Sequence, residues 1–220
     1  MMNHAERMAV FADADLYVVI TGEFCAGRSA LKVLDACLEA GVKLVQMREK
    51  NGSDLALYEL GRAFRSKTRE AGALMIVDDR VDLALALDAD GVHLGQTDLP
   101  IAAARRIAPE LVIGASSHNP EEAIAAQDAG ASYVNIGPIY PTQTKSVPTG
   151  VVGLDMIDAI RPLLRVPFTC MGGIKRDNIA PVVARGARHC AVVTAVTAAP
   201  DPGAAAAELR GLVCAGRSGW

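Results

Sequence analysis

Residues 29–50 read SALKVLDACLEAGVKLVQMREK, a stretch that contains one predicted helix followed by one predicted strand. Ser29 is a preferred residue at the start of a helix, and the apolar-periodic segment after it ends at Gly41, where glycine can take the left-handed conformation that ends helices. The short apolar run at 43–48 then predicts a buried strand. Such a unit is typical of a parallel sheet that is covered by helices.

Similar units follow one another along the whole chain. The junction EAGV at 39–42 returns as DAGA at 128–131 and as ARGA at 184–187, each time between a predicted helix and a predicted strand. Eight strands are predicted, each followed by a helix: Leu16 to Thr21, Lys43 to Arg48, Ala73 to Asp79, Gly91 to Gly95, Leu111 to Ser116, Tyr133 to Ile139, Pro167 to Gly172 and His189 to Val196. This repetition favours a single (β/α)8 TIM barrel over a doubly wound sheet.

The length and composition agree with one compact domain. A chain of 220 residues lies near the lower end for a TIM barrel, and its 51% of apolar and 21% of charged residues suit a well-buried core. We expect a single TIM-barrel domain over residues 1–220, with a short N-terminal extension at 1–14 and an irregular C-terminal tail at about 214–220.

The composition also indicates where the protein is located in the cell and which classes of partner it binds. Only 4% of the residues are aromatic and the formal net charge is −3, which argues against binding of single-stranded nucleic acid. Asp13 and Asp15 interrupt the first apolar run, and no stretch approaches the roughly 18 apolar residues of a membrane span. The five cysteines lack a C-x-x-C spacing, which fits a reducing compartment. We therefore expect a cytoplasmic protein with no nucleic-acid or membrane partner, compatible with a homo-oligomer.

The second predicted strand ends in QMREK, residues 46–50. In a barrel the reactive groups belong at the carboxyl ends of the strands, and the alternate residues Gln46, Arg48 and Lys50 should share one face there. Arg48 can grip phosphate oxygens through paired hydrogen bonds, while Lys50 supplies a compact charge. This combination suits a diphosphate, and the alternative is a solvated charged loop.

The next two strand ends carry carboxylates. The third strand runs into Asp78-Asp79-Arg80 and the fourth into the loop that contains Asp98. Mg²⁺ is typically held by one or two carboxylates together with water and substrate phosphate, so Asp79 and Asp98 are candidate ligands. The alternative is that both residues simply cap the helices that follow.

The last three strand ends suit a phosphate group. The sixth strand leads into GPIYPTQTK at 137–145, a long loop in which Thr142 and Thr144 can donate hydroxyls and Lys145 can neutralise charge, unless the segment is a generic turn. Closure of such a loop would exclude water. Glycines at 172–173 and the pair Val193-Thr194 end the seventh and eighth strands, where many barrels bind phosphate through backbone N–H groups.

Taken in order and spacing, six motifs give the chain a resemblance to the thiamine phosphate synthase family over nearly its whole length. They are QMREK (46–50), DDR (78–80), GVHLGQTD (91–98), GAS (114–116), GPIYPTQTK (137–145) and GGI (172–174). The resemblance implies a TIM barrel that couples 4-amino-2-methyl-5-hydroxymethylpyrimidine diphosphate to hydroxyethylthiazole phosphate, giving thiamine phosphate and pyrophosphate by a dissociative, Mg²⁺-assisted substitution.

The resemblance also implies a role for each matching residue. The pyrimidine diphosphate would be bound by Gln46, Met47, Arg48, Glu49, Lys50, Asp78, Ser116 and Lys145, of which Arg48, Lys50 and Lys145 would be the catalytic cations. The thiazole phosphate would be bound by Thr142, Gln143, Thr144, Gly173, Val193 and Thr194. Asp79 and Asp98 would hold Mg²⁺. His93 and His118 are interpreted as structural residues.

The chain departs from the family pattern chiefly at Asp78, where the family usually has an asparagine. Asp78 could be a further metal ligand, could be protonated, or could weaken diphosphate binding. Two milder departures are Thr194 in place of a serine and Met171 in place of a smaller aliphatic residue. Two alternatives are a thiazole tautomerase of the same family and a non-catalytic thiamine phosphate binding protein.

Overall fold

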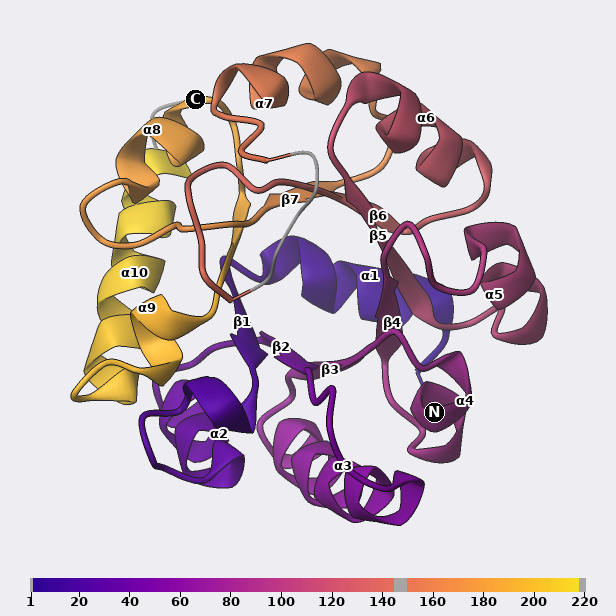
Figure 1. Cartoon of the computed structure of the whole chain (residues 1–220), viewed down its shortest axis with the longest axis vertical. Coiled ribbons are helices and arrows are strands. Elements are labelled where there is room, and N and C mark those ends of the chain that lie inside the picture. Colours follow the sequence, from indigo (N-terminus) through magenta and orange to yellow (C-terminus); the bar gives the residue numbers. More distant parts are fainter. Residues whose placement is uncertain (1, 145–149, 218–220) are drawn as a thin grey trace.

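The computed structural model describes residues 2–144 and 150–217, and eight parallel strands close into one barrel (Figure 1). The strands are β1 (Leu16–Ile20), β2 (Leu44–Met47), β3 (Leu74–Asp78), β4 (Gly91–Leu94), β5 (Val112–Ser117), β6 (Tyr133–Ile136), β7 (Phe168–Cys170) and β8 (His189–Val192). Each strand pairs with its successor, and β1 pairs with β8. The prediction of a (β/α)8 TIM barrel is confirmed.

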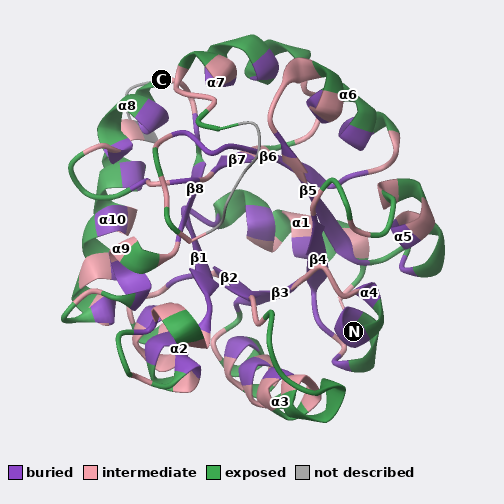
Figure 2. Ribbon diagram, in the orientation of Figure 1, coloured by how far each residue is buried: buried purple, intermediate pink, exposed green. Residues whose placement is uncertain are grey.

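Helices surround the barrel and turn their buried faces towards the strands (Figure 2). They are α2 (Ala30–Glu39), α3 (Asp54–Glu70), α4 (Val81–Ala86), α5 (Ile101–Ile107), α6 (Pro120–Asp128), α7 (Asp155–Ile160), α8 (Ile179–Ala184), α9 (Thr194–Thr197) and α10 (Pro202–Arg217), with short 3-10 turns η1 (Gly22–Phe24) and η2 (Arg161–Leu163). Within the described ranges, no helix is both long and apolar enough to cross a membrane.

The helix–strand unit of residues 29–50 forms as its sequence predicts. Ser29 caps α2 by accepting a hydrogen bond from Lys32 N at 3.3 Å, and Gly41 follows the helix with φ of +82°. The observed strands lie inside their predicted ranges, except that β5 ends at Ser117 rather than Ser116. The predicted eighth strand was too long at its end, because α9 begins at Thr194.

The C-terminal tail differs from the expectation of irregular structure from about residue 214. Helix α10 continues to Arg217, because Ala206, Leu209 and Val213 recur at helical spacing and are all buried. The helix packs against α2 and α8. The apolar stripe therefore extends the helix past residue 214, where an irregular tail was expected to begin.

The N-terminal extension is also ordered, as helix α1 (His4–Asp13). Asn3 and Glu6 form a capping box at its start. Figure 1 shows α1 in indigo across the middle of the ring, and Phe11 is fully buried with its ring centroid 4.8 Å from that of Tyr133 inside the barrel. Helix α1 thereby closes the end of the barrel opposite the carboxyl ends of the strands.

The barrel interior changes from apolar to polar towards the carboxyl ends of the strands. Its apolar layer consists of Phe11, Ala14, Tyr17, Val19, Leu44, Leu74, Ile76, Val112, Tyr133 and Ala191. Alternate strand residues face the same side, so Gln46 follows Leu44 and Asp78 follows Ile76 on the interior face. The polar groups of the barrel mouth thus lie directly above this buried, mainly apolar layer.

Gly114 leaves space for the Tyr133 ring in this apolar layer. The two residues are register partners on β5 and β6, and a Cβ at Gly114 would overlap the phenol end of the Tyr133 ring. Because that ring is buried against Phe11 and Tyr17, Gly114→Ala is expected to lower the free energy of unfolding by about 1–3 kcal/mol in chemical denaturation. Gly211→Ala is the control, because its Cβ would meet no atom and the helix should gain about 0.5–1 kcal/mol. Equal stabilities of the two variants would contradict this account.

Candidate active site

Two cations at the end of β2 converge on one carboxylate of β3. Lys50 Nζ lies 2.7 Å from Asp78 Oδ2, and Arg48 Nε lies 3.6 Å from the same oxygen. Lys50 also forms an ion pair with Asp79. Burial alone would lower the pKa of Lys50, but the Asp78 and Asp79 carboxylates raise it. Lys50 is therefore held as a cation, and both it and Arg48 already face a carboxylate of the protein.

Asp78 is the nearly buried member of this cluster, with 10% of its side chain exposed. Burial raises the pKa of Asp78, as does the neighbouring Asp79, while Lys50 and Arg48 oppose the rise. Across residues 2–144 and 150–217, no three His, Cys, Asp or Glu side chains come together as a metal site. Asp78 acts in this arrangement as a counter-ion for Lys50 and Arg48.

Asp79 and Asp98 lie together at the ends of β3 and β4. Asp79 has a φ of +60°, in the left-handed region where aspartate is enriched among non-glycine residues, and its N–H donates to His93 O at 2.8 Å. Asp98 Oδ2 accepts from Gly95 N at 2.7 Å. Burial raises the pKa of Asp98, and a hydrogen bond with Asp79 raises it further. Two carboxylates held this close repel each other and suit a shared divalent cation.

The helix-capping alternative for these two carboxylates is wrong. The N-cap residue of α4 is Arg80 and that of α5 is Pro100, so neither Asp79 nor Asp98 occupies a capping position. The pair instead projects from two neighbouring strand ends beside the cations of β2, which is the arrangement that the strand-end argument predicts.

A chain of hydrogen bonds across the barrel interior connects Gln46 to Ser116. Gln46 Nε2 donates to Tyr17 Oη at 2.7 Å, and Tyr17 Oη lies 3.0 Å from Tyr133 Oη. His93 Nδ1 lies 2.9 Å from Tyr133 Oη, and His93 Nε2 lies 3.0 Å from Ser116 Oγ. Burial raises the pKa of both tyrosines, so they stay neutral hydroxyls. The chain orients Gln46 and Ser116 at opposite sides of the mouth.

His93 and His118 differ in their surroundings. His93 belongs to the interior hydrogen-bond chain and directly orients Ser116, which the sequence did not indicate. His118 Nδ1 lies 2.8 Å from Glu122 Oε2 at the start of α6, a structural contact. Sequence reasoning could have found the role of His93 from its inward position on β4, two residues before the polar strand end.

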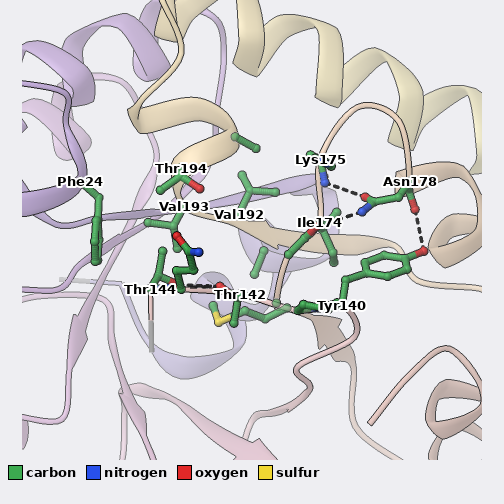
Figure 3. Close-up of a pocket in the computed structure, with 17 residues that line it drawn as sticks. Phe24, Tyr140, Thr142, Thr144, Ile174, Lys175, Asn178, Val192, Val193 and Thr194 are labelled. Atoms are coloured by element: carbon green, nitrogen blue, oxygen red, sulfur yellow. Dashed lines mark hydrogen bonds between the residues drawn. The ribbon is translucent and has the colours of Figure 1, made fainter. Parts of the chain in front are cut away.

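A cavity of about 830 Å³ opens at the ends of β6, β7 and β8 (Figure 3). All six residues predicted for the thiazole phosphate line it: Thr142, Gln143, Thr144, Gly173, Val193 and Thr194. Thr142 Oγ1 and Thr144 Oγ1 are 3.0 Å apart, so both hydroxyls lie on one side of the cavity. Among the lining residues within the described part of the chain, Lys175 alone is charged, which gives the cavity a cation and no carboxylate.

The loop after β7 is shaped by Gly173 and Asn178. Gly173 has a φ of +61°, and a Cβ there would lie 2.8 Å from Tyr140 Cβ, so the position requires glycine. Asn178 Nδ2 donates to Gly173 O at 2.9 Å, and Tyr140 Oη donates to Asn178 O at 2.8 Å (Figure 3). Sequence reasoning missed Tyr140, Lys175 and Asn178, which hold or line this cavity.

Two residues predicted for the diphosphate, Met47 and Glu49, do not join Arg48 and Lys50 at the barrel mouth. The Met47 side chain is buried in the core that contacts the helices. Glu49 Oε1 accepts a hydrogen bond from Gly22 N at 2.6 Å. Lys145 lies outside the described residues, so its role stays a prediction.

Comparison with known proteins places the chain among thiamine phosphate synthases. A family model described as thiamine monophosphate synthase matches residues 16–196. The chain is 45% identical over 206 residues to the thiamine-phosphate synthase of Chloroflexus aurantiacus, covering 94% of this chain and 95% of that one. It is 44% identical over 193 residues to the thiamine-phosphate synthase of Natronomonas pharaonis, covering 86% and 90%. A solved thiamine phosphate pyrophosphorylase from Pyrococcus furiosus has a TM-score of 0.87 at 40% identity, covering 93% of this chain and 98% of that one.

Proposed function

Because this chain belongs to the thiamine monophosphate synthase family, we propose that the two polar clusters at its barrel mouth bind the two substrates of one coupling reaction. The chain is a transferase that joins 4-amino-2-methyl-5-hydroxymethylpyrimidine diphosphate to hydroxyethylthiazole phosphate, giving thiamine phosphate and pyrophosphate. The main support for assigning the clusters is the cavity at the ends of β6 to β8, because every residue predicted for the thiazole phosphate lines it.

The pyrimidine diphosphate is assigned to the cluster on β2, β3 and β5. Arg48 and Lys50 supply the positive charge for its phosphates, while Gln46 and Ser116 supply hydrogen bonds from fixed positions. Lys145 is assigned to the same substrate from the sequence alone. Met47 can contribute only through its backbone, because its side chain belongs to the core.

Mg²⁺ is assigned to Asp79 and Asp98. The pair offers two oxygen ligands from neighbouring strand ends, and burial and the Asp79 carboxyl raise the pKa of Asp98 although the charge of Lys50 opposes the rise. A bound Mg²⁺ would stabilise the negative charge that builds up on the departing pyrophosphate. Asp79 would hold the metal, and Lys50, its ion-pair partner in this structure, would supply positive charge to the diphosphate beside it.

The proposed mechanism is dissociative. The bond between the pyrimidine methylene carbon and the diphosphate oxygen breaks, its electron pair leaves with pyrophosphate, and the amino-substituted ring stabilises the resulting cation. The thiazole nitrogen then donates its lone pair to form the new carbon–nitrogen bond. The protein must stabilise the negative charge on the departing pyrophosphate and align the two reactants. Arg48, Lys50 and Lys145 are assigned to charge stabilisation, and no general base is required.

The thiazole phosphate is assigned to the cavity lined by Thr142, Gln143, Thr144, Gly173, Val193 and Thr194. Gly173 lets the backbone approach the phosphate closely, and Thr194 keeps the hydroxyl of the serine that it replaces. The thiazole tautomerase and binding-protein alternatives are not favoured, because the relatives reported above are thiamine phosphate synthases. A cytoplasmic location and a homo-oligomeric assembly remain predictions.

Release of pyrophosphate tests the assignment. The purified chain is given each substrate alone and both together, with and without Mg²⁺, and pyrophosphate is measured. Release that requires both substrates and Mg²⁺ supports coupling at this site. Release without the thiazole phosphate would indicate hydrolysis, and release unaffected by a chelator would contradict the metal assignment to Asp79 and Asp98.

Asp78→Asn is expected to lower the KM for the pyrimidine diphosphate by about 10-fold, which corresponds to about 1.4 kcal/mol. The aspartate neutralises Lys50 and Arg48 before substrate arrives and repels the incoming diphosphate, whereas asparagine does neither. The measurement is initial-rate kinetics at saturating thiazole phosphate. The control is Asp82→Asn, which removes an exposed carboxylate that pairs with Arg80 and should leave KM unchanged. A higher KM in Asp78→Asn would contradict this account.

A further inference from the structure

The loop between β1 and α2, residues 21–25, supplies one wall of the thiazole cavity. Phe24 lines that cavity, while every other described lining residue lies between Tyr140 and Ala195. In Figure 3, Phe24 lies across the cavity from Ile174 and Asn178, beside Val193 and Thr194. Closure of the barrel between β1 and β8 brings this early loop against the last strands. Phe24 is thus the aromatic side chain that faces the cavity from the first half of the chain.

Glu49 holds this loop from the diphosphate side of the mouth. Gly22 N donates to Glu49 Oε1 at 2.6 Å, and a Cβ at Gly22 would lie only 3.2 Å from that oxygen. The contact fixes the first residue of the turn that ends at Phe24. Glycine at position 22 therefore allows the close approach on which the contact depends.

Two further contacts fix the same loop. Thr197 Oγ1, on α9, donates to Phe24 O at 2.7 Å, and Arg48 Nη1 donates to Thr21 Oγ1 at 3.4 Å. The loop is therefore held between the end of β2, which carries the diphosphate cations, and the helix that follows β8. A side chain that holds such a loop influences the cavity without touching its ligand.

We propose that Glu49 is a positioning residue for the thiazole phosphate: by holding Gly22 it fixes Phe24 as the aromatic wall against which the thiazole ring packs. This inference rests on the proposed function and moves Glu49 from the pyrimidine diphosphate set to the thiazole set. A carboxylate only accepts hydrogen bonds and would repel a diphosphate, whereas the backbone N–H of Gly22 is a matching donor. An aromatic face suits a flat heteroaromatic ring.

The test compares how each substitution changes the KM for each of the two substrates. Phe24→Ala is expected to raise the KM for hydroxyethylthiazole phosphate by about 10-fold and to leave the KM for the pyrimidine diphosphate within about twofold, because an aromatic contact is lost in one pocket only. Glu49→Ala should show the same pattern, at about 3- to 10-fold. Glu49→Gln should recover most of the thiazole KM, because its amide oxygen can still accept from Gly22 N.

The matched control is Glu23→Ala, which removes an exposed carboxylate from the same loop and should leave both KM values unchanged. A rise in the KM for the pyrimidine diphosphate in Glu49→Ala, with no recovery in Glu49→Gln, would show that the carboxylate acts at the diphosphate and would overturn the proposal. An unchanged thiazole KM in Phe24→Ala would overturn the assignment of the wall.

Calorimetric titration with hydroxyethylthiazole phosphate separates failure of this inference from failure of the proposed function. If the original chain binds hydroxyethylthiazole phosphate and Phe24→Ala binds it equally well, the inference alone is overturned. Absence of both binding and coupling in the original chain would overturn the proposed function as well. Circular dichroism of each variant identifies any loss of folding, and weaker thiazole binding by a folded Glu49→Ala supports the proposal independently of turnover.

Discussion

Asp98→Asn is expected to lower kcat/KM for thiamine phosphate formation by about 100-fold or more at limiting Mg²⁺. Substitution of a residue that only hydrogen-bonds to a metal ligand already lowers metal affinity or activity by about 10- to 100-fold. Loss of a direct ligand should therefore lower them at least as much. Asparagine keeps the size of the side chain and a carbonyl oxygen that can still accept from Gly95 N. The loop should therefore keep its shape while the site loses one negative charge.

The measurement is the initial rate as a function of Mg²⁺ concentration. The variant should need more Mg²⁺ for half-maximal rate, and a high concentration should restore part of the activity. Asp128→Asn is the control, because this exposed carboxylate pairs with Arg165 on the helix side of the barrel. An unchanged Mg²⁺ requirement in Asp98→Asn, with the barrel folded, would remove Asp98 from the metal site.

Lys50→Ala is expected to lower kcat by about 100- to 1,000-fold, the effect typical of removing one group that stabilises charge in the transition state. Lys50 is the cation closest to the paired carboxylates of β3, and their charge raises its pKa against the effect of burial. Its removal leaves Asp78 opposed only by Arg48 among the described cations of this cluster, so the KM for the pyrimidine diphosphate should also rise.

The double variant Lys50→Ala with Asp78→Asn separates these two effects. Removing the Asp78 charge should recover the KM for the pyrimidine diphosphate, because repulsion of the substrate is relieved, but it should not recover kcat. Lys67→Ala, which breaks an ion pair with Asp35 on the outer helices, is the control. Recovery of kcat in the double variant would show that Lys50 serves only to neutralise Asp78.

The strand ends were predictable from sequence because their chemistry is local. Gln46, Arg48 and Lys50 alternate along one strand, and the glycines at 172–173 mark a tight turn directly after another. The sequence-based expectation that Arg48 and Lys50 converge agrees with their shared contact to Asp78. The sequence could not distinguish between the three possible roles of Asp78, because they depend on the distances from Asp78 to side chains on other strands.

The terminal segments show where local patterns were insufficient. Helix α1 occupies the N-terminal extension because Phe11 can be buried inside a barrel that exists only once all strands have closed. Helix α10 runs to Arg217 because Val213 meets a surface formed by other helices. In both cases a local signal is present, the capping box of α1 and the apolar stripe of α10, and a tertiary contact that buries its apolar residues stabilises the helix.

The sequence by itself determined the barrel, its strand and helix order, the family and the residue types at the strand ends, because periodicity, glycine positions and motif spacing are properties of neighbouring residues. Only the tertiary structure decided that Glu49 holds Gly22, that Phe24 lines a cavity built by β6 to β8, and that Tyr17, Tyr133 and His93 connect Gln46 to Ser116. These contacts join residues that are distant in sequence. Glu49 meets Gly22 where β2 pairs with β1, and Phe24 reaches the cavity because β1 also pairs with β8 and closes the ring.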